Sequence, residues 1–239
     1  MQLNSLGIGL FFPYFVPMEK SYGQHLPEII DYAENLIQPE DTFLKDVRAR
    51  AEKNQIPSIH VGKFDGRHLE VIARAVGATK IVEIGTLAGY SGVCLARALP
   101  REGKLWTFEF EPKHAECARE TFRLSGFDSQ IELVLGAAVE MLPLINAFGP
   151  FDLVFVDADK VNYPNYLEWA AVNLRVGGTL LADNTFAWNM ITDTKFEDPA
   201  DAIDVQALQK FNLIIAHHSR FRVTMLPTGE GLTMAVKTK

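Results

Sequence analysis

The sequence predicts an open α/β fold, in which helices cover both faces of a doubly wound, mostly parallel β-sheet. From residue 80 onward, short β-branched runs alternate with helical stretches, as in parallel strands joined by crossover helices. Two of the runs, DLVFVD and GTLLAD, are apolar almost throughout, which is typical of strands buried on both faces. The 239 residues are 48% hydrophobic, enough for one domain with one core.

The expected elements follow one another along this single domain, 1–239. Helical patterns come first and form an N-terminal helical segment, 26–79, with helices at 26–38, 41–53 and 66–76. The α/β core follows at 80–239, with strands expected at 80–84, 104–110, 130–135, 151–156 and 179–182. The helices that connect these strands are expected at 90–99, 112–124, 138–145 and 163–174.

The end of the chain has a different pattern. A long helix near 199–217 precedes two strand-like runs, 221–227 and 232–237, which a Thr-Gly-Glu-Gly turn joins. Two strands with a short glycine-containing turn form a hairpin, so one antiparallel strand is expected to insert at the edge of the sheet. The complete sheet would then have seven strands.

The first 25 residues contain an apolar stretch, 6–16, with the sequence LGIGLFFPYFV. No basic residue precedes it, and it is too short for a membrane span and interrupted by Pro13. We expect an apolar arm that packs on the body or on a partner subunit, and no membrane span. A targeting or membrane-surface role remains the alternative.

Charge and cysteine content narrow the function classes. Lys and Arg total 23 against 30 Asp and Glu, and the net charge of −7 disfavours broad nucleic-acid binding. The two cysteines, Cys94 and Cys117, lie in apolar-periodic segments and do not suggest a disulfide framework. A reducing cytoplasm is the expected location.

The first strand-to-helix turn, IVEIGTLAGYSG at 81–92, predicts a ligand site, because ligands bind at the carboxyl ends of strands in open α/β sheets. A dinucleotide fingerprint would need glycine where Leu87 stands, and a P-loop would need a Lys-Ser/Thr pair. Glu83 fits an ammonium group better than a pyrophosphate. An acid of the next strand end, Glu109 or Glu111, could accept both ribose hydroxyls. A cationic nucleoside without pyrophosphate describes S-adenosylmethionine.

Acidic and amide side chains follow two further strands. Asp157, Asp159 and Lys160 come after the strand at 151–156, and Asp183 and Asn184 come after the strand at 179–182. Carboxylate and amide oxygens at one sheet edge suit Mg²⁺, and no Cys/His set with zinc spacing competes. Lys160, next to this proposed metal, is either a general base or a solvated lysine at a helix start. We favour the base.

With these residues in place, the chain resembles the metal-dependent small-molecule O-methyltransferases of the caffeoyl-CoA and catechol O-methyltransferase family. The resemblance runs from about residue 26 to the end. Its motifs, in order, are EIGTLAGYSG, the acid of FEFE, GAA at 136–138, FVDADKVNYPNY, LLADNT and LPTGEGLT. Six motifs in the family's order are far more specific than any one of them.

The resemblance implies a Rossmann-like methyltransferase fold and a role for each matching residue. The S-adenosylmethionine contacts would be Val61, Glu83, Gly85, Thr86, Ser91, Glu109, Ala138, Asp159 and Tyr166. The ligands of Mg²⁺, or of Mn²⁺ or Ca²⁺, would be Asp157, Asp183 and Asn184. Lys160 would be the catalytic base beside Asp157, and Asn189, aligned after a one-residue gap, would contact the acceptor. The resemblance also implies a homodimer.

The expected function is therefore methyl transfer from S-adenosylmethionine to a metal-bound hydroxyl of a catechol-like or caffeoyl-type small molecule. Three alternatives stay open. A hydroxyuridine of tRNA could be the acceptor, against which the negative net charge argues. The chain could instead be a non-catalytic S-adenosylmethionine-binding module. A nicotinamide oxidoreductase is the third, and Leu87 in place of a fingerprint glycine argues against it.

Overall fold

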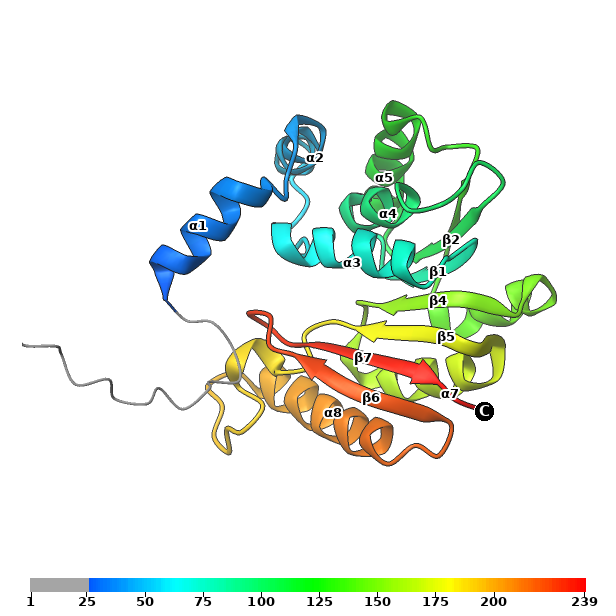
Figure 1. Ribbon diagram of the computed structural model, residues 1–239. Helices are drawn as coiled ribbons and strands as arrows, with labels where there is room; N and C mark the ends of the chain where they lie inside the picture. Colours follow the sequence, from blue (N-terminus) through cyan, green and yellow to red (C-terminus); the bar gives the residue numbers. More distant parts are fainter. Residues whose placement is uncertain (1–25) are drawn as a thin grey trace, which may run out of the picture.

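A computed structural model describes residues 26–239 (Figure 1), so the predicted apolar arm, 1–25, lies outside the described residues. Three helices come first: α1 (Pro27–Ile37), α2 (Thr42–Lys53) and α3 (Lys63–Ala75). Asp41 caps α2 by accepting the Leu44 backbone N–H at 3.0 Å. The N-terminal helical segment predicted from the sequence is confirmed.

A seven-stranded sheet follows, in the order β3-β2-β1-β4-β5-β7-β6. Its strands are β1 (Lys80–Ile84), β2 (Lys104–Glu109), β3 (Ile131–Leu135), β4 (Phe151–Val156), β5 (Leu174–Ala182), β6 (Phe221–Leu226) and β7 (Leu232–Lys237). The strands from β1 to β5 are parallel, and β7 runs antiparallel to both of its neighbours, β5 and β6. The predicted fold class and its single antiparallel strand are confirmed.

Helices cover both faces of this sheet (Figure 1). The helices after the first strand are α4 (Tyr90–Ala96), α5 (Pro112–Ser125), α6 (Ala138–Met141), α7 (Tyr163–Asn173) and α8 (Pro199–Ala216), with short 3₁₀ helices η1 (Leu142–Phe148), η2 (Lys160–Asn162) and η3 (Ala187–Asn189). Residues alternate in direction along β1: Ile81 packs in the core with α2 to α5, and Val82 packs in the core with α7 and α8. The sheet is therefore buried on both faces, as its apolar strands predict.

Two predicted boundaries are wrong for identifiable reasons. The helix expected at 138–145 stops at Met141 and continues as the 3₁₀ helix η1, since Pro143 has no N–H for an α-helical hydrogen bond. Strand β5 begins at Leu174 rather than at 179, because the sheet takes in Gly177 and Gly178 at a register shift against β4.

Two further expectations are the absence of a membrane-spanning helix and of a disulfide between the two cysteines. Among residues 26–239, no helix combines the length and hydrophobicity that a bilayer span requires. Cys94 and Cys117 are both buried and both free thiols, in agreement with the reading that they form no disulfide.

Candidate active site

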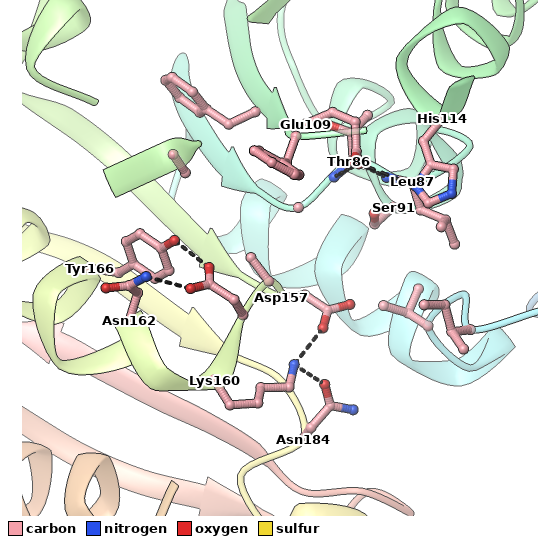
Figure 2. A pocket seen from close by; sticks show the side chains of 18 of the residues that line it. Thr86, Leu87, Ser91, Glu109, His114, Asp157, Lys160, Asn162, Tyr166 and Asn184 are labelled. Carbon is pink, nitrogen blue, oxygen red and sulfur yellow. Dashed lines mark hydrogen bonds and ion pairs between the residues drawn. The ribbon is translucent and has the colours of Figure 1, made fainter. Parts of the chain in front are cut away.

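A cavity of about 930 Å³ lies at the carboxyl ends of β1, β2, β4 and β5. The sheet order reverses between β1 and β4, and such a switch point is where open α/β sheets bind ligands. Figure 2 shows two groups of lining side chains, one around Glu109 and Thr86 and the other around Lys160 and Asn184. We call the first group the donor end and the second the acceptor end.

The donor end depends on Gly85, directly after β1. Its φ of +102° lies in the left-handed region, and a Cβ there would lie 1.9 Å from the Asp157 carbonyl oxygen. Only glycine allows the tips of β1 and β4 to approach so closely. This contact brings the first turn of the sheet next to the segment that carries Asp157 and Lys160.

Glu109, the last residue of β2, is held by three backbone N–H groups. Its Oε2 accepts the N–H of Thr86 at 3.3 Å and of Leu87 at 2.7 Å, and its Oε1 accepts the N–H of Glu111 at 2.9 Å. His114 Nδ1 lies 3.5 Å from Oε1. The carboxylate is therefore fixed at the cavity wall, where its remaining lone pairs can accept hydroxyl groups.

A second carboxylate, Asp159, lines the cavity after β4. The Tyr166 hydroxyl donates to its Oδ1 at 2.6 Å, and the Asn162 amide donates to its Oδ2 (Figure 2). Val61 and Ala138 also line the cavity, and the carbonyl of Val61 accepts a hydrogen bond from Arg48 at 2.8 Å.

Glu83 is completely buried and lies behind the wall rather than in it. Its Oε2 accepts the Thr107 hydroxyl at 2.5 Å, and its Oε1 has no hydrogen-bond partner among the described residues. Burial raises the pKa of Glu83 to about 7, although hydrogen bonds from Thr107 and Ser91 oppose the shift. Ser91 stands between this carboxylate and the cavity, since it lines the cavity itself.

The acceptor end centres on Lys160, the first residue of η2, which is 7% exposed. Its Nζ donates to Asn184 Oδ1 at 2.6 Å, to the Tyr163 hydroxyl at 2.8 Å and to Asp157 Oδ1 at 3.2 Å. Tyr163 is itself buried and donates to the Asp183 carbonyl at 3.2 Å. The tips of β4 and β5 therefore meet on one amine, as Figure 2 shows for Asp157 and Asn184.

Negative charge is crowded beside this amine. Asp183 is 5% exposed, and burial, followed by repulsion from Asp157, raises its pKa well above the ordinary range. Glu230, in the turn between β6 and β7, accepts the Asn184 side-chain amide. Carboxylates packed this closely favour a bound cation.

The predicted metal ligands fit a hard divalent cation by this chemistry. Asp157 and Asn184 both direct their Oδ1 atoms to Lys160 Nζ, and Asp183 directly follows β5, where its Oδ1 accepts the Asn184 N–H at 2.8 Å. The set holds two carboxylates and one amide oxygen, which suits Mg²⁺. Across residues 26–239, no group of three His, Cys, Asp or Glu side chains lies close enough together to hold a metal ion without the amide of Asn184.

The turn after β5 presents Trp188 to the cavity. Ala187, Trp188 and Asn189 all have left-handed φ values, +50°, +53° and +71°, which is a strained run for non-glycine residues. The Trp188 ring centroid lies 5.8 Å from Lys160 Nζ. Asn189, the residue that the resemblance implied for acceptor contact, is exposed and absent from the cavity wall.

The sequence reasoning missed several lining residues, namely His60, Trp188, Asp204 and Glu230. The signal for Glu230 was present, because an acid in a hairpin turn beside the β5 tip can reach that tip. Asp204 had only a helical spacing to Leu208 on the buried face of α8, and this pattern carries no chemistry.

Comparison with known proteins gives a consistent picture. A family model described as O-methyltransferase matches residues 34–238. A catechol O-methyltransferase of Niastella koreensis is 35% identical over 197 residues, covering 82% of this chain and 87% of that protein. One from Mycobacterium tuberculosis is 36% identical over 177 residues, covering 74% and 79%. The crystal structure of an O-methyltransferase from Bacillus cereus in complex with SAH has a TM-score of 0.81 at 32% identity, covering 88% of this chain and 97% of that one.

Proposed function

The chain belongs to the O-methyltransferase family, and from this premise we propose that it methylates a hydroxyl of a small catechol-like molecule with S-adenosylmethionine. We propose further that a divalent cation, most simply Mg²⁺ and alternatively Mn²⁺ or Ca²⁺, takes part. The observation that carries the proposal is the convergence of Asp157, Asn184 and Lys160 at one end of a cavity whose other end holds Glu109.

The donor end supports S-adenosylmethionine as the methyl donor. This molecule supplies a methyl group that its sulfonium charge already activates. Glu109 is fixed in place to accept the two ribose hydroxyls, while Gly85 lets the backbone approach the ligand closely. The buried Glu83, behind Ser91, favours a ligand with an ammonium group. The SAH complex of the Bacillus cereus relative adds support from outside this chain.

Lys160 is the proposed general base. Tyr163 and Asn184 hold its Nζ in position, and the ring of Trp188 stands near it on the cavity side. In this role Lys160 accepts the proton of the acceptor hydroxyl while that oxygen attacks the methyl group and the sulfur leaves as the neutral thioether. Two reactants held next to each other in the correct orientation react far faster than in solution.

Asp157, Asp183 and Asn184 are the residues that would hold the cation. When bound, a divalent cation supplies Lewis-acid stabilisation to the oxygen that loses its proton. The three side chains would hold that charge beside Lys160. Burial and then repulsion from Asp157 raise the pKa of Asp183, and this shortage of positive charge supports a cation at this point.

Methyl transfer from labelled S-adenosylmethionine to a neutral catechol, with and without EDTA, tests this function directly. We expect turnover that EDTA abolishes and Mg²⁺ restores. Turnover that EDTA leaves unchanged would remove the metal from the proposal. A parallel reaction with hypomodified tRNA tests the tRNA alternative. If tRNA becomes labelled and catechol does not, the acceptor is tRNA and not a small molecule.

Lys160→Ala separates the base from the donor site. General bases contribute about 10²–10⁴-fold to the rate, so we expect turnover to fall by about this factor. Binding of SAH, measured by calorimetry, should persist, because the donor end is built from other residues. Lys210→Ala, an exposed lysine on α8, is the matched control and should keep full activity. Full turnover of Lys160→Ala would contradict the base role.

The remaining expectations stay predictions. A homodimer and a cytoplasmic location follow from the family resemblance and the cysteine pattern, and the structure tests neither. The non-catalytic alternative would gain support if SAH bound tightly while no catechol was methylated.

A further inference from the structure

We propose that Asp204 selects the acceptor by charge, favouring a catechol whose side chain carries an ammonium group over neutral or anionic catechols. This inference rests on the proposed function, because it assigns a residue to the acceptor that this function requires. It goes further by stating the chemical class of that acceptor.

Asp204 reaches the cavity from α8. Val205 and Leu208 on the same helix are buried in the core, and Asp204, adjacent to this buried stripe, lines the acceptor end. Its carboxylate is close enough to Lys160 and Asp159 for both to affect its ionisation. The Asp204 side chain therefore forms the part of the cavity wall that α8 contributes, close to Lys160.

Every other carboxylate of the cavity wall has a partner within the fold. Asp157 bonds to Lys160, Asp159 to Tyr166, Glu109 to backbone N–H groups and Glu230 to Asn184. The Asp204 side chain makes no hydrogen bond or ion pair with any described residue. Burial raises the pKa of Asp204, with Lys160 opposing the shift and Asp201 and Asp159 adding to it.

The acceptor end lacks positive charge to receive an anion. Its lysine, Lys160, is already shared between Asp157 and Asn184, and no arginine lines the described cavity. His60 lines the cavity too, but burial lowers its pKa to about 4, so it is neutral at physiological pH. An acceptor bearing carboxylate or phosphate groups would face Asp204 and Glu230 without compensation.

An ammonium group on the acceptor would be attracted both by the Asp204 carboxylate and by the Trp188 ring. It can pair with Asp204, and the aromatic ring of Trp188, which also lines the cavity, can attract a cation. Because Asp204 is only half-buried, the gain is moderate, and about a tenfold preference is expected. The reacting hydroxyls stay at Lys160, so the preference should appear in KM rather than in kcat.

Three catechols that differ only at the end of their side chain test the proposal: aminoethyl, hydroxyethyl and carboxyethyl catechol. With the full-length enzyme, kcat/KM should be highest for the amine and lowest for the carboxylate. Asp204→Asn should lower kcat/KM for the amine about tenfold through KM and should lower kcat/KM for the hydroxyethyl compound much less. Asp204→Lys should reverse the order and favour the carboxylate.

Two controls separate this inference from the proposed function. Asp201→Asn removes an acid one turn earlier on α8, outside the cavity wall, and should keep the wild-type preference. Added salt should weaken the amine preference of the wild-type enzyme and have little effect on the hydroxyethyl compound. Methylation of all three catechols with no charge preference, or a preference that survives in Asp204→Asn, overturns the role of Asp204 and leaves the proposed function intact. No methylation of any catechol overturns both.

Discussion

Glu83 shows how a single buried group links stability to ligand binding. Its carboxylate is completely buried, and only one of its oxygens is hydrogen-bonded among the described residues. The raised pKa, about 7, means that the folded protein holds this proton to a higher pH than the unfolded chain does. Stability attributable to Glu83 is therefore lost as pH rises from about 4.5 to about 7.

Glu83→Gln should abolish this loss of folding stability at high pH, because glutamine does not ionise. The variant should gain stability relative to wild type as pH rises, by up to about 3 kcal/mol between about pH 5 and about pH 8. Urea unfolding of both ligand-free proteins at the two pH values measures this difference. The same change should weaken SAH binding, because the negative charge is gone. A stability difference that does not vary with pH would contradict the assignment.

Single residues were predictable from the sequence where chemistry and chain position coincide. Asp157, Lys160 and Asn184 each lie shortly after the end of a buried strand, so their meeting at one edge follows from the parallel sheet. Asp204 and Trp188 were not predictable in this way. Their approach to Lys160 depends on how α8 packs and on a strained left-handed turn, and neither leaves a periodic signal.

At the level of elements, the turn from β1 to α4 sets the distance between the two ends of the cavity. Gly85→Ala would force a Cβ against the backbone of Asp157, which cannot move without displacing β4. We expect several kcal/mol of destabilisation and loss of SAH binding, measured by thermal unfolding with and without SAH.

Gly126→Ala is the matched control for this change. Gly126 also has a positive φ, +79°, but nothing lies within 4 Å of the Cβ that alanine would add. Its cost should be limited to backbone strain, about 1–2 kcal/mol, with SAH binding retained. Equal destabilisation by both substitutions would mean that the close approach of β1 and β4 is unimportant.

The elements themselves were largely predictable, because apolar runs and turn residues are local signals. The exceptions have local causes as well: Pro143 converts the end of a helix to a 3₁₀ helix, and Gly177 and Gly178 lie inside β5 rather than before it. A glycine pair normally marks a turn. Here β4 pairs with β5 both before and after Gly177 and Gly178, and the sequence of β5 alone cannot indicate this pairing.

At the level of the whole molecule, α1 is the least buried helix of the described chain. None of its residues is buried, and Tyr32 and Leu36, four apart on one side of the helix, are 67% and 64% exposed. Figure 1 shows α1 extending away from the sheet, and the ion pair of Glu34 with Lys63 at 2.6 Å connects it to α3. Such an apolar face supports the homodimer that the family resemblance implies.

Leu36→Glu tests this prediction without touching the cavity. We expect the full chain to be a dimer by light scattering and the variant to shift toward monomer with its fold unchanged by circular dichroism. Glu28→Gln, also on α1, is the control and should stay dimeric. A wild-type chain that is monomeric at every concentration tested would contradict the predicted homodimer.

The position of β7 affects how this protein can be made. β6 precedes β7 in the chain, yet β7 separates it from β5, so β6 has no strand to join until residues 232–237 have been synthesised. Glu230 stands in the turn between these two strands and reaches Asn184. A polypeptide still growing on the ribosome therefore carries every proposed metal ligand before β7 can pair with β5 and before Glu230 can reach Asn184, so the acceptor end should be completed only in a late step of folding.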